Sequence, residues 1–581
     1  MARRDLIDCA RGNRPADLLI RGGRIVNVLT GELHAADVAI LGERIAGVGP
    51  GYEALETLDA GGALLLPGFL DGHVHIESSM CVPSQFARVV VPAGTTTVIV
   101  DAHEIANVRG LAGLAFMLAD SEHIPLDVYM MAPSCVPASP YETSGAILGS
   151  QDLAKFLAEG RVLGMGEMMN FPGVVGADAE VMAKLALGTA IVDGHAPALT
   201  GKDLCAYVAA GVMSDHECRT ADEAVEKLRL GMHVMIREGS LARNLVDLLP
   251  AINATNQERC MLVTDDRHAD DLVAHGHINY AVKLAISHGL DPVVAVKLAS
   301  LNCARYFRLD GVGAIAPGWQ ADILLVDGWD AFNVGLVVKR GRVVARDGVA
   351  LFDPPRASTA GVLDTVRVAA LAPGAFDVRS PGSAARVRVI GIVPGQCWSH
   401  SLERDLRIVD GVVMPDLAQD VAKIAVIERH QATGNVGLGF VHGFGIARGA
   451  IASTVAHDAH NLMVMGTNAM DMHVAAQALV ESQGGVCAVR DGQVLELLAL
   501  PIGGIMSDQP MANVAAKLHA LQEVACEQLG IRAPHPFMTL AFLALSVIPE
   551  LKITDRGYVD VSRFDLVPVL APSPAYPSGQ Q

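Results

Sequence analysis

The residue types in this chain that are best able to do chemistry are histidines and carboxylates that follow short apolar runs. His73 and His75 stand two residues apart, at the end of the run that begins at Leu64. Because residues i and i+2 of a strand share a face, both imidazoles can reach one metal ion. Two such histidines also occur in ordinary packed strands, so the pair needs support from other residues.

Four further polar residues each close a short apolar run. They are Glu167, His195, His216 and Asp265. Taken singly, each is as compatible with a cap or a surface position as with a metal ligand. Together with the first histidine pair they place four histidines and two carboxylates where parallel strands would converge. Burying so many polar groups without an ion would be costly, so we predict a metal centre.

The donor set predicts two metal ions. Six N and O ligands without sulfur exceed one tetrahedral zinc site, whereas two ions bridged by a carboxylate and a hydroxide accommodate them. Such a pair lowers the pKa of a bound water towards neutrality, which provides a nucleophile without a catalytic cysteine or serine. Manganese is the expected metal, with iron and zinc as alternatives, because all three accept these ligands.

The elements that must position these residues have the pattern of repeated βα units. Short apolar runs alternate with Ala/Leu-rich helical stretches between about residues 64 and 308, which is typical of a parallel sheet. Eight strands are predicted, at 64–70, 95–100, 126–131, 162–165, 190–192, 211–213, 233–236 and 261–263. Eight such units predict an α/β fold, a (β/α)8 TIM-like metallo-hydrolase barrel with its active site at the carboxyl ends of the strands.

The barrel, residues 64–310, is predicted to be inserted into a small β-sandwich domain formed by residues 1–63 and 311–358. Its first hairpins are expected to turn at Gly22-Gly23 and at Gly42-Glu43. A similar run of strands returns after residue 320, so the two ends of this region are expected to pair.

Residues 359–570 are predicted to form a C-terminal α+β domain. Hairpins are expected at Asp410-Gly411 and Asp491-Gly492, and helices around 470–483 and 512–529. Residues 571–581 are rich in Pro, Ser and Gly, and we predict a mobile tail.

Composition limits the class of protein. The 581 residues are 51% hydrophobic and 18% charged, which suits large buried cores, and the net charge of −19 disfavours nucleic acid and anionic membranes as partners. The ten cysteines include no C-x-x-C pair, which fits a reducing compartment. No uncharged apolar run reaches the ~18 residues needed to span a bilayer. We therefore predict a cytoplasmic protein.

Three phrases make the assignment more specific: Asp71–Met80, Gly166–Val174 and Asp193–Pro197. They resemble the adenine deaminase family of the amidohydrolase superfamily, and the likeness covers nearly the whole chain. Many relatives bridge their metals with a carbamylated lysine, whereas this chain has Glu167 at that position. The resemblance implies hydrolysis of adenine to hypoxanthine and ammonia in purine salvage or nucleobase catabolism. It also implies that Asp265 is both ligand and proton shuttle, and that the protein is a homo-oligomer.

The acid that protonates the purine ring is less well defined. Some superfamily deaminases carry a glutamate three residues after the histidine of strand 5, but here Ala-Pro-Ala follows that histidine. The candidates are Glu77, His103, Glu104 and Glu217. We favour Glu77, with His103 second, because both extend metal-bearing strands towards the pocket mouth. An ordinary salt-bridged carboxylate is the alternative for each.

Other functions remain open at this point. A cyclic-amide hydrolase, dihydroorotase-like or hydantoinase-like, would use the same metals, and a metal-free barrel would serve as a non-catalytic scaffold. The H-x-E and P-C-x-x-C signature of cytidine-type zinc deaminases is absent. Two later stretches, 453–461 and 501–508, suit either a lid and base-recognition wall or an internal hydrogen-bonded network with a turn. An independent metal site there would need ligands that the sequence does not identify.

Overall fold

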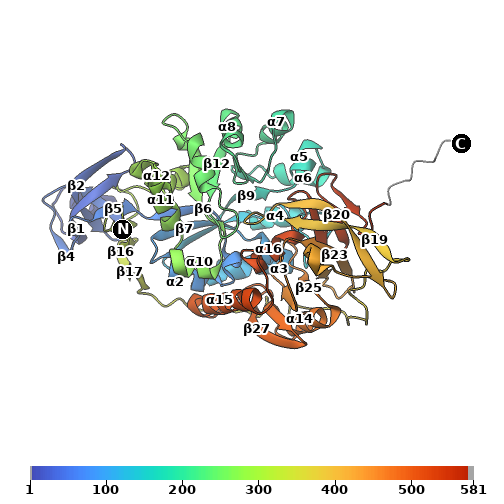
Figure 1. Ribbon diagram of the computed structural model, residues 1–581. Coiled ribbons are helices and arrows are strands. Elements are labelled where there is room, and N and C mark those ends of the chain that lie inside the picture. The colour runs from blue at the N-terminus through green and yellow to red at the C-terminus, as the bar shows by residue number, and fades with distance from the viewer. Residues whose placement is uncertain (1–2, 573–581) are drawn as a thin grey trace. The chain divides into compact units, whose positions relative to one another are not determined.

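The computed structural model describes residues 3–572, which divide into two compact units (Figure 1). The first unit contains residues up to 102, 117–134 and 150–357. The second contains 103–116, 135–149 and the residues from 358 onward. Two segments that lie between barrel strands along the chain therefore group with the C-terminal part. The predicted tail falls largely outside the described residues.

The first unit contains the predicted barrel. Its strands pair in parallel, in a six-stranded order β10-β9-β8-β7-β6-β14 and a three-stranded order β11-β12-β13. The strands are β6 (Phe69–His75), β7 (Thr95–Asp101), β8 (Asp127–Ala132), β9 (Val162–Met168), β10 (Val192–Gly194), β11 (Ser214–Asp215), β12 (His233–Arg237), β13 (Cys260–Val263) and β14 (Asp265–Asp266). The TIM-like α/β fold is confirmed.

Helices alternate with these strands. Several begin at a side chain that caps their free N–H groups, as Thr220 does for α8 and Asp178 for α6. The helices of this unit include α2 (Pro83–Val90), α4 (Ser150–Phe156), α6 (Ala179–Leu185), α7 (Gly201–Ala209), α8 (Ala221–Arg229), α10 (Ala269–His275), α11 (Ile278–Ser287), α12 (Pro292–Leu298) and α13 (Leu301–Tyr306). This alternation brings all strand carboxyl ends to one end of the barrel.

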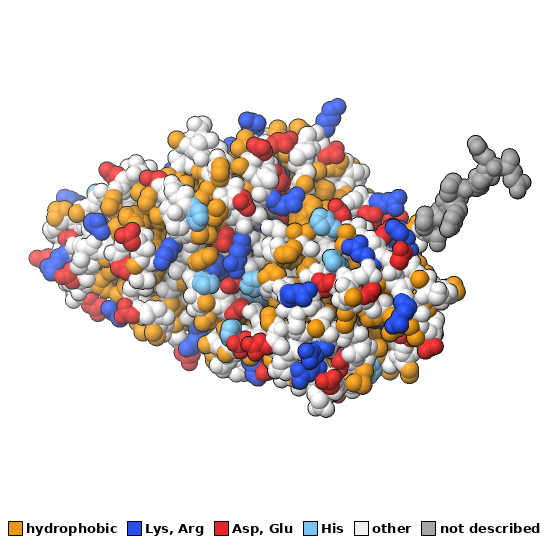
Figure 2. Space-filling model, viewed as in Figure 1, with side chains coloured by type: hydrophobic (Ala, Val, Ile, Leu, Met, Phe, Trp, Pro, Cys, Tyr) orange, Lys and Arg blue, Asp and Glu red, His pale blue; other side chains and the backbone are white. Residues whose placement is uncertain are grey.

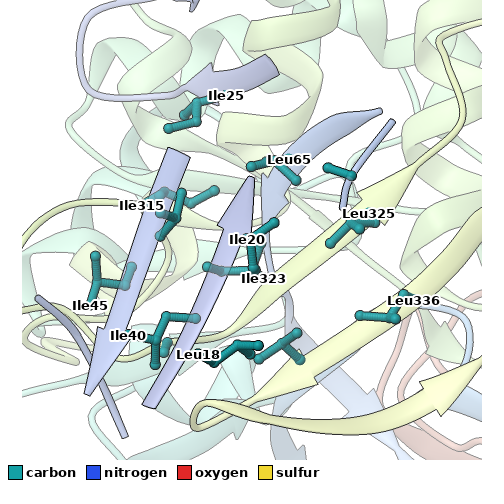
Figure 3. Packing of buried hydrophobic residues seen from close by; sticks show 14 residues of the cluster. Leu18, Ile20, Ile25, Ile40, Ile45, Leu65, Ile315, Ile323, Leu325 and Leu336 are labelled. Atoms are coloured by element: carbon teal, nitrogen blue, oxygen red, sulfur yellow. The ribbon is translucent and has the colours of Figure 1, made fainter. Parts of the chain in front are cut away.

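A nine-stranded sheet joins two segments that are far apart in the sequence (Figure 1). Its strands are β1 (Ala16–Asn27), β2 (Glu32–Leu41), β3 (Arg44–Val48), β4 (Ala54–Asp59), β5 (Leu64–Pro67), β15 (Ile323–Val326), β16 (Val334–Lys339), β17 (Arg342–Arg346) and β18 (Val349–Ala350). The antiparallel pair β5 and β15 connects the segments. Aliphatic side chains from both, including Ile20, Leu65 and Ile323, pack in one buried cluster (Figure 3).

Two local predictions in this region are wrong. Gly22-Gly23 is not a hairpin turn, because β1 continues through it with a bulge in its pairing to β2. The glycines serve another purpose: Gly22 has φ +72°, and a Cβ on Gly23 would lie 2.5 Å from the Leu65 side chain. Leu64–Pro67 also belongs to this sheet, so the first barrel strand starts only at Phe69.

The second unit is built on another nine-stranded sheet, in the order β21-β20-β19-β23-β22-β25-β24-β26-β27. Its strands are β19 (Ala384–Ile392), β20 (Ser399–Val409), β21 (Val412–Val413), β22 (Val421–Ile427), β23 (Val436–His442), β24 (Ala450–Ser453), β25 (Leu462–Gly466), β26 (Gly485–Arg490) and β27 (Gln493–Ala499). Helix α14 (Ala469–Glu481) packs on β24, β25 and β26, and α15 (Met511–Glu527) packs on β27. The hairpins predicted at Asp410-Gly411 and Asp491-Gly492 are present.

On the face drawn in Figure 2, acidic and basic side chains are interspersed with apolar ones. Within residues 3–572, no helix combines the length and the apolar character needed to cross a membrane.

Candidate metal centre

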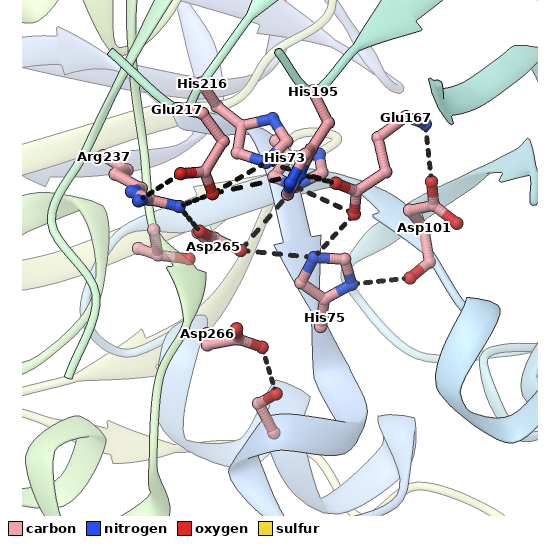
Figure 4. A network of polar contacts seen from close by, with 12 residues as sticks. His73, His75, Asp101, Glu167, His195, His216, Glu217, Arg237, Asp265 and Asp266 are labelled. Carbon is pink, nitrogen blue, oxygen red and sulfur yellow. Dashed lines mark hydrogen bonds and ion pairs between the residues drawn. The ribbon is translucent and has the colours of Figure 1, made fainter. Parts of the chain in front are cut away.

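The six predicted ligands converge in the first unit, at the carboxyl ends of the barrel strands (Figure 4). Each side chain is buried, with residue exposures between 2% and 5%. They come from the end of β6, from β9, from the residues directly after β10 and β11, and from the start of β14; the six are His73, His75, Glu167, His195, His216 and Asp265. The barrel thus gathers residues that span nearly two hundred positions of sequence.

The first histidine pair faces one oxygen of each carboxylate. His75 Nε2 lies 3.3 Å from Glu167 Oε1 and 3.2 Å from Asp265 Oδ1. His73 Nε2 lies 3.8 Å from the same Glu167 oxygen and 3.7 Å from the same Asp265 oxygen. Separations of this size suit four donor atoms arranged around one ion.

The second histidine pair faces the other oxygen of Glu167. His195 Nδ1 lies 2.6 Å from Glu167 Oε2, and His216 Nε2 lies 3.3 Å from it. Glu167 therefore presents one oxygen to each histidine pair, which is the arrangement that a carboxylate needs in order to bridge two ions.

The histidine rings of the site differ in their hydrogen bonding and in their charge state. The Nδ1 of His75 lies 2.8 Å from the backbone oxygen of Asp101, a contact that orients the ring with its Nε2 facing the carboxylates. His73 Nε2 is buried and has no hydrogen-bond partner among residues 3–572. Burial and the neighbouring His216 ring lower the pKa of His73 well below its ordinary value, so this ring is neutral. At His75, burial is outweighed by hydrogen bonding with Asp265 and Glu167, which raises its pKa well above the ordinary value. At His216, burial is outweighed by the Glu167 charge, which raises its pKa to about 9. A neutral imidazole is the form that binds a metal, so His73 is ready to bind, and divalent ions would displace protons from the other two rings.

The carboxylates are held in their ionised forms. Burial alone would raise the pKa of Glu167, but the His216 ring and hydrogen bonding with His195 lower it well below its ordinary value. Asp265 behaves in the same way: burial is outweighed by its hydrogen bond with His75 and by the Arg237 charge, which lower its pKa. Asp265 also has φ +60°, a strained left-handed conformation of the kind often found at functional positions.

One residue of the site, Arg237, is absent from the sequence-based prediction. It is buried at the end of β12, donates to both oxygens of Glu217, and donates to Asp265 Oδ2 at 2.7 Å (Figure 4). A charged residue that closes an apolar strand is the same signal that singled out the ligands, so the sequence did carry a sign of it. Arg237 fixes the orientation of Asp265 from the side away from the histidines.

Comparison with known proteins identifies the family of this chain. Residues 64–344 match the amidohydrolase family model, and residues 396–565 match the adenine deaminase C-terminal domain model. The chain is 48% identical to adenine deaminase 2 of Carboxydothermus hydrogenoformans, over 97% of this chain and 99% of that protein. It belongs to the adenine deaminase family. An adenine deaminase of Nitratidesulfovibrio vulgaris is also 48% identical, over 97% of this chain and 98% of its own length.

Among solved structures, a beta-aspartyl dipeptidase of Fervidobacterium islandicum is similar, with a TM-score of 0.45 and 19% identity. The similarity covers 58% of this adenine deaminase family member and 98% of the dipeptidase chain.

The candidates for the ring acid occupy different surroundings. Glu77 is buried in the 3-10 turn η1 (Ile76–Ser79), two residues after His75. Glu217 follows His216 directly and is held by Arg237. His103 begins α3 (His103–Asp120) and belongs to the second unit, where its Nε2 lies 3.6 Å from Asp458 Oδ1.

A buried ion pair between Lys227 and Asp215 holds the backbone next to the second histidine pair. Lys227 Nζ lies 2.9 Å from Asp215 Oδ2 and donates to the backbone oxygen of Ala196 at 2.8 Å. Asp215 in turn accepts the Ala196 N–H at 2.7 Å. Burial alone would raise the pKa of Asp215, but the Lys227 charge lowers it to about 2. The pair therefore clamps the residue after His195 to the residue before His216.

Replacing Lys227 with Met is expected to destabilise the protein strongly. The change leaves the Asp215 charge buried without its cation, a loss that typically costs about 3–5 kcal/mol. Chemical denaturation of the two proteins measures the difference in the free energy of unfolding. Lys202→Met, at an exposed position of α7, is the matched control and should change stability little. Equal stabilities for both variants would show that the buried pair does not support the fold.

Proposed function

We propose that this protein is a hydrolytic adenine deaminase that converts adenine and water to hypoxanthine and ammonia. The assignment of the reaction class rests on one observation: each oxygen of Glu167 faces a different pair of buried histidines. The assignment of adenine as the substrate rests on relatives named adenine deaminase, which are 48% identical and match this chain over nearly their whole length. These two lines of support are independent.

The six converging residues would hold two divalent ions. When bound, such ions supply water with a pKa near neutrality at the barrel mouth. The chain's own part is to move protons while water adds at C6 of the purine ring. We assign Asp265 as the acceptor of the proton from that water, because Arg237 fixes its Oδ2 and leaves Oδ1 directed towards the histidines. The proton then leaves with the amino group as ammonia.

The ring nitrogen must gain a proton when C6 is attacked. Glu217 suits this step poorly, because both of its oxygens accept hydrogen bonds from Arg237, a pairing that stabilises the charged carboxylate. We assign Glu217 to orienting Arg237, and through it Asp265. Glu77 remains the preferred acid and His103 the second candidate.

A reconstitution screen tests the function. Metal-depleted protein is loaded with manganese, iron or zinc and offered adenine, dihydroorotate and a hydantoin. We expect ammonia and hypoxanthine from adenine, with activity restored when the six barrel ligands are loaded with about two ions. A ring-opened acid from a cyclic amide, without ammonia from adenine, would favour the cyclic-amide hydrolase instead. Full activity in the metal-depleted protein would exclude the metal-dependent reaction.

Three finer assignments remain predictions. We infer manganese as the native metal, a homo-oligomeric assembly and a cytoplasmic location. The ten free thiols among the described residues support a reducing compartment. Metal analysis of the purified protein and its sedimentation behaviour test the first two assignments, and localisation of the tagged protein tests the third.

A further inference from the structure

The second unit contains a buried cluster of histidines and carboxylates of its own, here called the α3 cluster. It comprises two residues from the start of α3 and three from the loop between β24 and β25: His103, Glu104, His457, Asp458 and His460. Every member is at most 4% exposed as a side chain. The loop lies within the stretch 453–461, for which the sequence offered no further ligands. The structure supplies them from α3, more than three hundred residues earlier.

The geometry of the α3 cluster resembles that of the barrel ligands. His457 Nδ1 lies 3.1 Å from Glu104 Oε1 and 3.8 Å from Asp458 Oδ1. The same Asp458 oxygen lies 3.6 Å from His103 Nε2. Among the six barrel ligands, the histidine-to-carboxylate separations run from 2.6 to 3.8 Å. Both sets place nitrogen and oxygen donors at the spacing of ligands that share one ion.

The charges of the α3 cluster also favour a cation. The α3 cluster contains two buried carboxylates, Glu104 and Asp458, and buried carboxylates favour a cation beside them. Asp458 Oδ2 has no hydrogen-bond partner within residues 3–572. Burial and the Asp458 charge raise the pKa of the nearby Glu142 to about 8, so this third carboxyl is kept neutral. A divalent ion would neutralise the remaining pair.

We propose that the α3 cluster binds one divalent transition-metal ion through Glu104, His457 and Asp458. Nitrogen and oxygen donors without sulfur suit manganese, iron or zinc. No residue of this set belongs to the barrel's six ligands, so the ion is additional to the barrel pair. The proposal does not depend on the substrate of the enzyme.

His460 is not assigned as a ligand. Its Nδ1 accepts the N–H of Ala456 at 3.0 Å, so a neutral ring carries its proton on Nε2. That Nε2 lies 4.0 Å from Glu104 Oε2, which is too far for a hydrogen bond, and because it carries the proton it offers no lone pair to an ion. Removal of His460 should therefore weaken metal binding less than removal of His457.

Metal stoichiometry of the full-length protein tests the site. Chelated protein is reloaded with Mn2+, and separately with Zn2+, desalted, and analysed by plasma mass spectrometry. We expect about three ions per chain in the unaltered protein and about two in His457→Ala. Glu167→Gln should lose barrel ions and keep the ion of the α3 cluster. His473→Ala, on the exposed face of α14, is the matched control and should keep all three.

A second variant tests the site in case His457→Ala does not fold. Asp458→Asn preserves size, removes one ligand charge, and should also lower the stoichiometry by about one ion. Circular dichroism and thermal melting verify that each variant is folded. The proposal is overturned if the unaltered protein binds about two ions, or if folded His457→Ala and Asp458→Asn keep every ion. Either result leaves the adenine assay unaffected, so failure of this site and failure of the deaminase assignment are distinguishable.

Discussion

Asp265→Asn should abolish most turnover while leaving most of the metal bound. The amide keeps the size of the side chain and one oxygen that can face His75, but it cannot accept a proton from the attacking water. Loss of general acid–base catalysis of this kind typically costs about 10²–10⁴-fold in rate. Steady-state assays of ammonia release, combined with metal analysis of the same preparation, measure both quantities.

Asp266→Asn is the control for this experiment. Asp266 is the next residue, accepts a hydrogen bond from Ser78, and is separate from the six ligands (Figure 4). It should therefore lose far less activity than Asp265→Asn. Normal turnover in Asp265→Asn would remove this residue from the mechanism, and coincident loss of metal would assign it a purely ligating role.

Glu167→Gln should give the opposite pattern, with loss of the metal itself. An amide offers one carbonyl oxygen and one NH2 group, so it cannot present an oxygen to each histidine pair as the carboxylate does. Metal affinity should fall by more than the roughly 10–100-fold that follows loss of a residue outside the ligand set. Titration of the metal-depleted variant with Mn2+ measures the change.

Glu159→Gln provides the comparison, because Glu159 is exposed in the segment that precedes β9. It removes the same charge near the same strand and should bind metal normally. Excess Mn2+ should restore part of the activity of Glu167→Gln if occupancy is its main defect. Full occupancy and normal turnover in Glu167→Gln would show that another group joins the two ions.

The convergence of the six candidate ligands could be predicted because the signals are local. His73 and His75 are recognisable from the two-residue repeat of a strand, and Glu167 from its place at the end of an apolar run. Barrel topology requires such ends to meet, so the repeated βα pattern alone brings distant residues to one site. The pairing of the two distant segments in the nine-stranded sheet was likewise predicted, from strands that recur after residue 320.

The roles of Arg237, Gly22 and Gly23 could not be predicted from local sequence patterns. The role of Arg237 depends on which carboxylates lie across the barrel from it, and sequence spacing does not report this. At Gly23, the approach of the Leu65 side chain requires a glycine inside a continuous strand, and the same dipeptide would suit a turn equally well. Both outcomes depend on contacts between separate elements.

By itself, the sequence determined the strand periodicity, the residue types at the strand ends and hence a metal-dependent barrel hydrolase. Only the tertiary structure decided that the Glu167 oxygens divide between two histidine pairs, and that Glu104 meets His457 in the second unit. The reason is physical: periodicity follows from the backbone geometry of neighbouring residues, whereas the direction of a side chain's atoms is set by packing against residues hundreds of positions away.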